Sequence, residues 1–287
     1  MISRYRVIAV ALVLVLGLGA ALSFSSVREA AAGFLSIFRV EKVQTVSLDL
    51  NDLQQIESAL REGGRKVDLK QFGRLEVDGK VKMTPVTLAE AQKMVSFAVK
   101  EPQVVPPGLF PLQILYSSPA TASFTLKVNN VNALLEHFGS KSLLPPELDG
   151  KKFSLDLPAA VVMQWAAPDG RPELTIVQSY SPQLKVPEGV DLENVRKALL
   201  GLPILPDDLK RQLTAIDDWQ HTAVIPGING STRSVTVQGV PGAFITEPGS
   251  GGLSGENSLI WVKDGLFYAV QGKITCEQAL QTANSLR

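Results

Sequence analysis

The stretch VIAVALVLVLGLGAALSF, from Val7 to Phe24, decides how the rest of the chain is arranged, because it contains no charged residue. A helix of this length would be about 27 Å long, close to the roughly 30 Å hydrocarbon core of a bilayer. We therefore expect residues 7–26 to form a transmembrane signal-anchor helix, preceded by a short cytoplasmic N-terminus at residues 1–6.

Charges on the two sides of this segment predict its orientation. Arg4 and Arg6 precede it, whereas Arg28 and Glu29, which follow it, cancel each other. Because arginine and lysine accumulate on the cytoplasmic side of membrane spans, the N-terminus is expected in the cytoplasm. The expected localisation is therefore the cell membrane, with a single span and an extracytoplasmic C-terminal domain.

A cleaved signal peptide is the alternative interpretation of the same segment. Small residues at Gly19, Ala21 and Ser23 follow an apolar core and resemble a cleavage site. Both interpretations export the chain. A buried helix of a water-soluble protein is disfavoured, because the segment is apolar on all faces and Gly17 would weaken a helix in water.

Composition limits the classes of partner and of fold. The 28 Lys and Arg residues equal the 28 Asp and Glu residues in number, so no net charge attracts nucleic acid, and we expect no nucleic-acid partner. Cys276 is the only cysteine, which excludes a disulfide framework and a thiolate metal cage within the chain. The roughly 255 residues after the apolar segment are enough for one large domain or two small ones.

Residues 27–40 have apolar side chains at helical spacing, and this pattern predicts an amphipathic juxtamembrane helix. The helix could lie along the outer membrane interface or pack on the globular domain, and the sequence leaves both open. Val43 to Leu48 then alternates as a short strand. Asp49 is placed as the N-cap of a helix that carries Leu53 and Leu60 on one face.

Segments of alternating polarity, separated by turn residues, predict antiparallel strands over much of residues 41–287. Asp-Gly pairs favour these connections, because they tolerate the positive φ angles of tight hairpin turns. The predicted hairpins turn at Asp78-Gly79, Ser118-Pro119, Pro168-Asp169-Gly170, Gly239 to Gly242, and Asp264-Gly265.

Capping residues predict helices between and after these strands. Each predicted helix has an apolar face with which it can pack on a sheet. The signals that start four of them are Thr87 with Glu90, Asp191, Pro206, and Thr275 with Gln278, and a further short helix is predicted from Asn130 to Phe138. In the last helix, the inward face is expected to carry Cys276, Ala279, Leu280 and Ala283.

We therefore predict an α+β fold, in which an N-terminal transmembrane helix is followed by an extracytoplasmic domain at residues 41–287. The domain is expected to consist of antiparallel β-hairpins with helices packed on one side. Strands and helices do not alternate strictly, which disfavours a doubly wound parallel sheet. Pro145-Pro146 and Asp149-Gly150 mark a candidate division near residues 145–150.

The sequence contains no recognisable catalytic arrangement. A nucleophilic triad requires a histidine close to a serine or cysteine, and the two histidines, His137 and His221, lie in no such motif. No Gly-x-Ser-x-Gly sequence is present either. We therefore expect structural histidines, no catalytic residues and no enzymatic activity.

Metal and cofactor sites are not predicted. His137, His221 and Cys276 lack the spacing of metal-ligand pairs, and Cys276 is expected to be a small apolar residue of a helix face. The glycine-rich GSGGLSG, from Gly249 to Gly255, lacks the lysine of a phosphate-binding loop and precedes a strand rather than a helix. A surface loop is expected there.

Three further polar patterns have structural explanations. Asp207-Asp208 lies at a predicted helix start and Asp217-Asp218 at a helix end, where solvated charges are ordinary. Asn229-Gly230-Ser231 matches a glycosylation sequon, but these residue types also form turns, and a turn is expected.

The C-terminal sequence SLIWVKDGLFYAVQGKITCEQALQTANSL combines an aromatic hairpin, an Asp-Gly turn and a Thr-capped helix. The positions that carry this pattern are Trp261, Asp264, Gly265, Tyr268, Thr275, Ala283, Ser285 and Leu286. Upstream, TLAEAQKMVSFAVKEPQVVPPGL contains a capped helix, a Phe-containing strand and spaced prolines. The two blocks resemble the C-terminal domain of unknown function found in membrane-anchored bacterial proteins related to anti-sigma factors.

This resemblance implies a single-pass bacterial protein with an extracytoplasmic sensory or binding domain, of a kind also compared with lipoprotein-sorting carriers. Only about six residues precede the membrane segment, so no cytoplasmic sigma-binding domain is expected. The prediction is a non-catalytic binding or sensory protein whose ligand is a peptide, a lipid or a protein. The alternative is an exported lipid or lipoprotein carrier with a cleaved leader. The sequence does not identify the binding residues.

Overall fold

The computed structural model describes residues 36–49, 51–54, 71–78, 81–203, 205–228, 230–246 and 255–287. Strands predominate in these residues and helices accompany them, which confirms the α+β class. The predicted transmembrane helix at residues 7–26 and the N-terminus at residues 1–6 lie outside the described residues.

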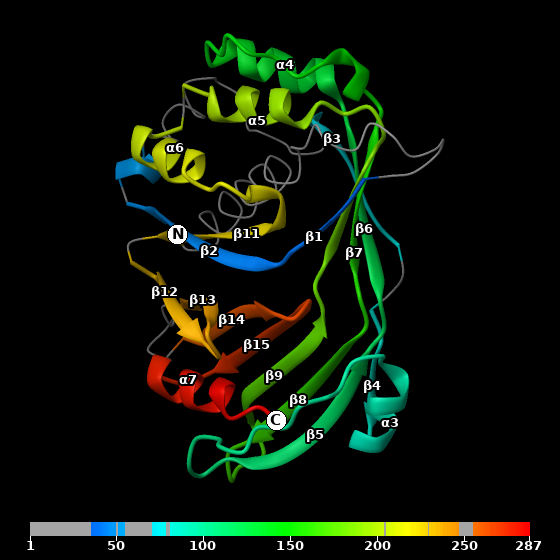
Figure 1. Ribbon diagram of the computed structural model, residues 1–287, viewed down its shortest axis with the longest axis vertical. Coiled ribbons are helices and arrows are strands. Elements are labelled where there is room, and N and C mark those ends of the chain that lie inside the picture. The colour runs from blue at the N-terminus through cyan, green and yellow to red at the C-terminus, as the bar shows by residue number, and fades with distance from the viewer. Residues whose placement is uncertain are drawn as a thin grey trace.

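The described strands form three sheets (Figure 1). The upper sheet has the order β1 (Ser36–Arg39), β10 (Gln183–Val186), β7 (Lys152–Leu157), β6 (Ala120–Leu126) and β3 (Gly73–Asp78). The lower sheet has the order β12 (Thr232–Val237), β13 (Val240–Ile245), β14 (Asn257–Lys263), β15 (Leu266–Gly272), β9 (Pro172–Tyr180), β8 (Ala160–Ala166), β5 (Phe110–Ser117) and β4 (Met83–Val86). The third sheet is the β2–β11 pair, formed by β2 (Lys42–Leu48) and β11 (Thr222–Ile228). These two strands run parallel, so the expectation of antiparallel pairing is wrong for them.

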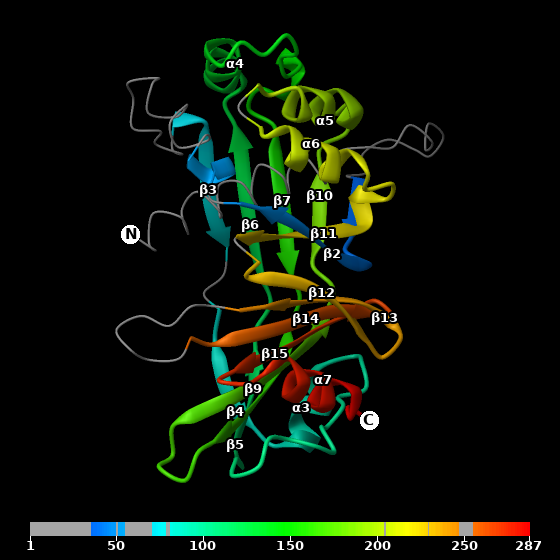
Figure 2. The ribbon, with the colours of Figure 1, turned by 90° about the vertical axis from the view of Figure 1, so that its left-hand side faces the viewer.

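Four long chain paths run through both the upper and the lower sheet. The order β10-β7-β6-β3 above repeats as β9-β8-β5-β4 below, and each upper strand adjoins its lower counterpart in sequence. Three of the junctions are Ser118-Pro119, Pro158-Ala159 and Ser181-Pro182. Because proline has no N–H to donate to a strand ladder, the regular pairing is interrupted at these positions. The result is a tall, curved antiparallel ribbon (Figure 1, Figure 2).

Two predicted hairpins are wrong. The strands on either side of Asp78-Gly79 do not pair with each other, because β3 pairs with β6 and β4 pairs with β5. Likewise, β5 and β6 flank Ser118-Pro119 but belong to different sheets. Alternating polarity shows that a segment is a strand with two unlike faces, but it does not identify the neighbouring strand.

The other three predicted hairpins are confirmed. β8 pairs with β9 across Pro168-Asp169-Gly170. β12 pairs with β13, and their turn lies at Gln238-Gly239, at the start of the predicted region. β14 pairs with β15 across Asp264-Gly265, whose φ angles of 53° and 74° are typical of a type I′ turn.

The predicted helices form, although the helix predicted from Asn130 begins two residues earlier, at Val128. α3 (Leu88–Met94) and α7 (Cys276–Asn284) begin with complete capping boxes, in which the N-cap threonines are Thr87 and Thr275. The remaining helices are α4 (Val128–His137), α5 (Leu192–Leu200), which Asp191 caps, and α6 (Asp207–Thr214), which follows Pro206.

The helix predicted after Asp49 is only partly described. Residues 51–54 are helical, and Asp49 Oδ1 accepts a hydrogen bond from the Asp52 N–H at 2.7 Å, as an N-cap should. The continuation that was predicted to Leu60 lies outside the described residues.

The amphipathic helix predicted over residues 27–40 is wrong for its last residues. Ser36–Arg39 forms β1, which pairs antiparallel with β10 at the edge of the upper sheet. Phe38 packs against the upper core from this strand. Pairing with β10 satisfies the backbone groups of β1 and overrides the helical spacing of its side chains. Residues 27–35 lie outside the described residues.

Residues 145–150 connect two neighbouring strands. α4 and the 3₁₀ turn Pro146–Leu148 lie between β6 and β7, which pair with each other along the upper sheet. The candidate division near residues 145–150 is therefore a connection at the top of one sheet (Figure 1).

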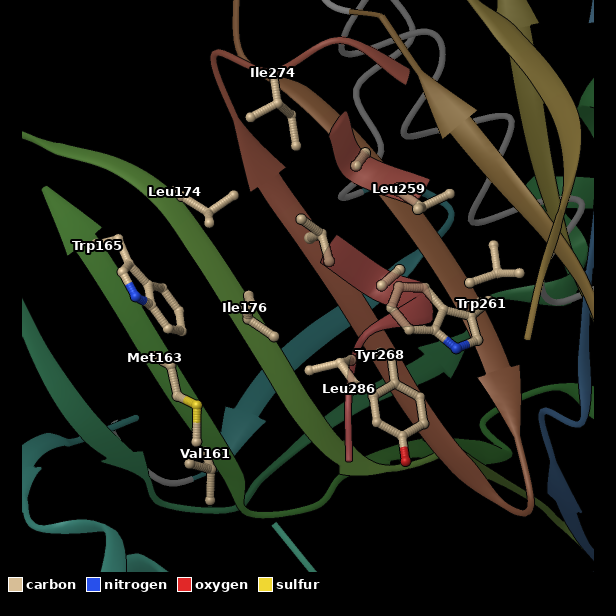
Figure 3. Packing of buried hydrophobic residues seen from close by; sticks show 14 of the residues in the cluster. Val161, Met163, Trp165, Leu174, Ile176, Leu259, Trp261, Tyr268, Ile274 and Leu286 are labelled. Atoms are coloured by element: carbon tan, nitrogen blue, oxygen red, sulfur yellow. The ribbon is translucent and has the colours of Figure 1, made fainter. Parts of the chain in front are cut away.

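Two large cores lie on the sheets. The upper core joins α4, α5 and α6 to the upper sheet, with Phe153, Val186 and Leu209 among its buried members. The lower core joins α3 and α7 to one face of the lower sheet, and Figure 3 shows β8, β9, β14 and β15 contributing side chains to it. Within it, the rings of Trp261 and Tyr268 stack with centroids 5.1 Å apart.

The predicted inward face of α7 is confirmed. Ala279 and Ala283 are completely buried in the lower core, and Cys276 and Leu280 pack against its border. The fold therefore uses the single cysteine as a small apolar residue.

The β2–β11 pair connects the two halves of the molecule. Val43 packs with Ala243 and Val262 of the lower sheet, whereas Val46 and Leu48 are buried in the upper core. Because successive side chains of a strand point to opposite faces, β2 presents one buried face to each side.

Gln178 is a completely buried polar residue of β9 that fastens the segment after α3. Its Oε1 accepts a hydrogen bond from the Lys100 N–H at 2.9 Å, and its Nε2 donates one to the Lys100 carbonyl at 2.6 Å. Both backbone groups of Lys100 therefore depend on one side chain.

We expect Gln178→Leu to lower the free energy of unfolding by about 2 kcal/mol, because it leaves two backbone groups without partners. Urea denaturation of the full chain in a non-ionic detergent, followed by tryptophan fluorescence, measures this. Gln164→Leu is the matched control, since Gln164 bonds only to Gln113 at the exposed side of the sheet. Equal effects of the two substitutions would contradict the role of Gln178.

Candidate functional site

The two faces of the upper sheet differ in chemistry. Its outer face is polar, and neighbouring strands are linked across it by side-chain contacts. Lys185 Nζ lies 2.6 Å from Asp156 Oδ2, the Thr121 hydroxyl donates to Asp156 Oδ1 at 2.9 Å, and Lys152 Nζ lies 3.5 Å from Glu76 Oε2. The polar side chains of the outer face therefore pair with one another, and this face can be exposed to water.

The inner face of the upper sheet is apolar and only partly covered. On its β10 side, α5 and α6 lie over the sheet and bury Val186 (Figure 2). Toward β3 the apolar side chains remain open, with exposed fractions of 60% for Leu75, 65% for Val77, 36% for Leu155 and 39% for Leu157. Soluble proteins rarely leave such neighbouring apolar side chains exposed without a use.

Strand register shapes this open area into a groove. Ala122 of β6 lies between Leu155 of β7 and Val77 of β3, and Ala120 lies opposite Leu157. An alanine side chain ends at Cβ, so the middle strand is lower than its two neighbours. We call the channel formed by these five residues the alanine groove.

An aromatic ring closes one end of the alanine groove. Phe124 follows Ala122 on the same face and lies opposite Leu75. A Cβ atom at Gly73 would be 2.1 Å from Phe124 Cζ, so the ring occupies the space that a larger residue at position 73 would need. Glycine at position 73 leaves room for the Phe124 ring to pack against β3, and the ring closes this end of the groove.

A cleft lies on the outer face of the upper sheet, where the upper and lower sheets meet. This junction cleft has a volume of about 410 Å³, and its polar lining is Arg39, Thr121, Asp156 and Gln183. Ala120 and Leu157 line it as well. The register places Arg39, Gln183, Asp156 and Thr121 in one row on the outer face, so the cleft opens there, whereas the alanine groove lies on the inner face.

The two charged residues that line the junction cleft, Asp156 and Arg39, differ in their partners. Hydrogen bonding from Lys185, with a smaller contribution from Thr121, outweighs burial and lowers the pKa of the Asp156 carboxyl. With its amide oriented to satisfy both groups, Gln183 accepts hydrogen bonds from Arg39 Nε at 3.3 Å and Nη2 at 2.7 Å. Asp156 is thus neutralised by a lysine, whereas Arg39 has a neutral partner.

One cluster of candidate metal ligands occurs among the described residues, and it consists of Glu41, Asp218 and His221. His221 Nδ1 lies 2.7 Å from Asp218 Oδ1, and Lys42 Nζ lies 3.2 Å from Asp218 Oδ2. Burial raises the pKa of Asp218, but His221 and Lys42 together lower it below its ordinary value. A lysine on the carboxylate favours an ion-pair network that fastens the start of β2, rather than a metal site.

The remaining sequence candidates are dispersed. His137 ends α4 beside the ring of Phe138, far along the chain from His221, and no serine, threonine or cysteine of the described residues hydrogen-bonds to either histidine side chain. Asp207 and Asp208 lie in the first turn of α6, as predicted. The turn expected at residues 229–231 is confirmed for its described part, since Ser231 N–H donates to the Ile228 carbonyl at 3.0 Å. The glycine-rich residues 249–254 lie outside the described residues.

Comparison with known proteins yields no relative, since no family model, curated protein or solved structure matches the chain. Within the described residues, no helix is both long and apolar enough to cross a bilayer. The resemblance to anti-sigma-factor-related proteins thus stays a prediction.

The alanine groove was not identified in the sequence, although one signal for it exists. In ATASFTL, residues 120–126, small apolar residues alternate with hydroxyl residues before a phenylalanine. This pattern predicts a strand with a shallow apolar face. It does not show that Val77 and Leu155, far apart in the chain, become the walls.

Acidification tests the Lys185–Asp156 pair at the junction cleft. Because the fold lowers the pKa of Asp156, the stabilisation is complete above the ordinary value of 3.8 and is lost as the pH falls through the lowered value. Asp156→Asn should therefore lose less free energy of unfolding than the wild type between about pH 5 and about pH 2. Urea denaturation across this pH range measures the difference. A difference that persists unchanged in a Lys185→Met background would contradict the pairing.

Proposed function

We propose that this protein is a membrane-anchored, extracytoplasmic lipid-binding protein that holds a hydrocarbon chain in the alanine groove. The observation that carries the proposal is the open part of the inner face, where Leu75, Val77, Leu155 and Leu157 are exposed beside a covered core. Burying hydrocarbon there would gain about 0.8 kcal/mol for each CH₂ group removed from water.

The lining of the groove favours a hydrocarbon chain over a peptide. Its walls and floor are the aliphatic side chains of β3, β6 and β7. The backbone groups of β6 and β7 pair on both sides within the sheet, and β3, the edge strand, pairs with β6. A peptide lying there would bury its own N–H and C=O groups without partners, which costs free energy. A hydrocarbon chain has no such groups.

The N-terminal segment supports a location where lipid is available. Val7 to Phe24 is long and apolar enough to enter a bilayer, and Arg4 and Arg6 favour a cytoplasmic N-terminus. The described domain would then lie outside the cytoplasm, next to the membrane. In this setting the groove could report the presence of a lipid, in the sensory manner implied by the resemblance to anti-sigma-factor-related proteins.

A lipid carrier with a cleaved leader is the second candidate, and the same groove supports it. The two functions differ in whether Val7 to Phe24 stays attached. Intact mass measurement of the protein isolated from membranes decides this, because cleavage would give a mature N-terminus near residue 22 or 24. A retained segment favours the anchored protein.

The topology has its own test. Alkaline phosphatase fused after Arg287 should be active in intact cells, because this enzyme requires disulfide bonds that form only outside the cytoplasm. Deleting residues 7–24 in the same fusion is the control and should abolish the activity. A fusion to the complete chain that is inactive, while a cytoplasmic reporter at the same position is active, would contradict export.

Photocrosslinking tests lipid binding. The full chain is placed in bilayers that contain a phospholipid with a diazirine on its acyl chain, and crosslinked peptides are identified by mass spectrometry. We expect crosslinks in β6 and β7, in addition to those in residues 7–24. Ala122→Phe should reduce the β6 and β7 crosslinks about tenfold, because its ring fills the groove and displaces one or two CH₂ groups.

Thr125→Phe is the matched control, because Thr125 lies on the same strand but on the opposite, outer face. This variant should keep the wild-type crosslinks. Crosslinks confined to residues 7–24 in the wild type, or an equal loss in both variants, would overturn the proposed function.

A further inference from the structure

We propose that β3 pairs antiparallel with β3 of a second copy of this chain, with Leu75 at the centre of the pair, so that two upper sheets become one. This inference concerns the assembly of the protein and does not depend on lipid binding. β3 is the last strand of the upper sheet, and within the described residues only β6 pairs with it. Its other edge therefore offers a row of backbone N–H and C=O groups to a further strand.

The other end strands of the two larger sheets are less suited to pairing with a partner. In β4, Pro85 has no N–H to donate to a neighbour. β12 lies beside β2, where the hydroxyls of Thr45 and Ser234 are 2.9 Å apart, and β1 lies beside the 3₁₀ turn Trp219–His221. β3 contains no proline, and its inner side chains are exposed and apolar. Among these four strands, β3 is therefore the best template for a partner strand.

The hydrogen-bond pattern shows which residues of β3 face this edge. The Lys127 N–H donates to the Phe72 carbonyl at 2.9 Å, and these two residues continue the β3–β6 register as a hydrogen-bonded pair. Such pairs alternate along antiparallel strands. The backbone groups of Gly73, Leu75 and Val77 therefore point away from β6, toward the open edge.

A pair centred on Leu75 matches these groups and also matches the side chains on both faces. Leu75 lies opposite Leu75 of the second copy, and Gly73 lies opposite Val77, so residues that point to the open edge meet one another. On the outer face, Arg74 lies opposite Glu76 of the second copy, and symmetry repeats this contact. Apolar side chains and opposite charges that are directly opposite across strands stabilise pairing. The sequence of β3 is thus complementary to itself.

The neighbouring register is less favourable. A pair centred on Glu76 would also join the two open edges, but it would place the two Glu76 carboxylates opposite each other, and like charges in this position are destabilising. Within one chain, Glu76 lies 2.9 Å from Arg74 and 3.5 Å from Lys152. In the pair centred on Leu75, Glu76 keeps these partners and gains Arg74 of the second copy.

This pairing also covers apolar side chains that one copy leaves exposed. The Phe124 ring occupies the space that a side chain at Gly73 would need. Since Val77 of the second copy lies opposite Gly73, its side chain would contact this ring, and the two Leu75 side chains would contact each other. A twofold axis perpendicular to the sheet places both inner faces on the same side. The two alanine grooves would therefore lie side by side on one continuous sheet.

Disulfide formation tests the register. Single cysteines are introduced in a Cys276→Ala background, which removes the one native thiol, and dimers of the full chain in bilayers are measured after mild oxidation by non-reducing electrophoresis. In Leu75→Cys, the two Cα atoms would be about 5.5 Å apart, within the range of a disulfide. Val77→Cys is the matched control on the same face, because its two copies would lie about 14 Å apart along the strands. We expect about tenfold more dimer from Leu75→Cys.

Charge reversal tests the contacts on the outer face. In the Leu75→Cys background, Arg74→Glu and Glu76→Arg should each lower the dimer yield about fivefold, because each converts two opposite-charge contacts into like-charge contacts. The double substitution restores opposite charges and should restore the yield. Recovery in the double variant also shows that the single variants lost pairing and not the fold.

Three results would overturn the pairing. These are equal dimer yields from Leu75→Cys and Val77→Cys, a double charge reversal that does not recover, and more dimer from Glu76→Cys than from Leu75→Cys, which would move the axis to Glu76. Lipid crosslinks at β6 and β7 are a separate measurement, so the proposed function and the pairing of β3 can fail independently.

Discussion

The burial of β2 on both faces is the constraint on which the arrangement of the molecule depends. Thr45 bonds to Ser234 of the lower sheet at 2.9 Å, while Ser47 exchanges two backbone hydrogen bonds with the Gln212 side chain of α6. A strand between two cores cannot shift without exposing apolar surface on one side. It therefore holds α6 at a fixed height above the lower sheet, and with it the layer of helices over the upper sheet.

The position of this helical layer creates the site. α5 and α6 cover the β10 side of the inner face, and the same apolar surface continues uncovered toward β3. A sheet of five strands is wider than two short helices can cover. The outer face of the same sheet carries ion pairs such as Lys185–Asp156, and these charged groups can be exposed to water. One sheet thus offers a solvated face and an apolar face, part of which the described residues leave exposed.

Local features were predictable because neighbouring residues produce them. The capping boxes at Thr87 and Thr275 and the turn at Asp264-Gly265 depend on groups a few residues apart, and all three are found where the sequence places them. Two of the breaks in the long paths, at Asp78-Gly79 and Ser118-Pro119, were wrongly predicted as hairpin turns for the same reason. Ser118-Pro119 has the chemistry of a turn, but the chain passes through it into the next sheet instead of reversing.

The sequence by itself determined most of the strands and helices, the capping boxes, the apolar segment at Val7 to Phe24, and the balance of charge, since each follows from local chemistry or from composition. Only the tertiary structure decided that β3, β6 and β7 are neighbours and that Ala122 lies between Val77 and Leu155. These relations depend on pairing between segments distant in the chain. Such pairing is chosen by the burial of whole faces, which no single stretch of sequence contains.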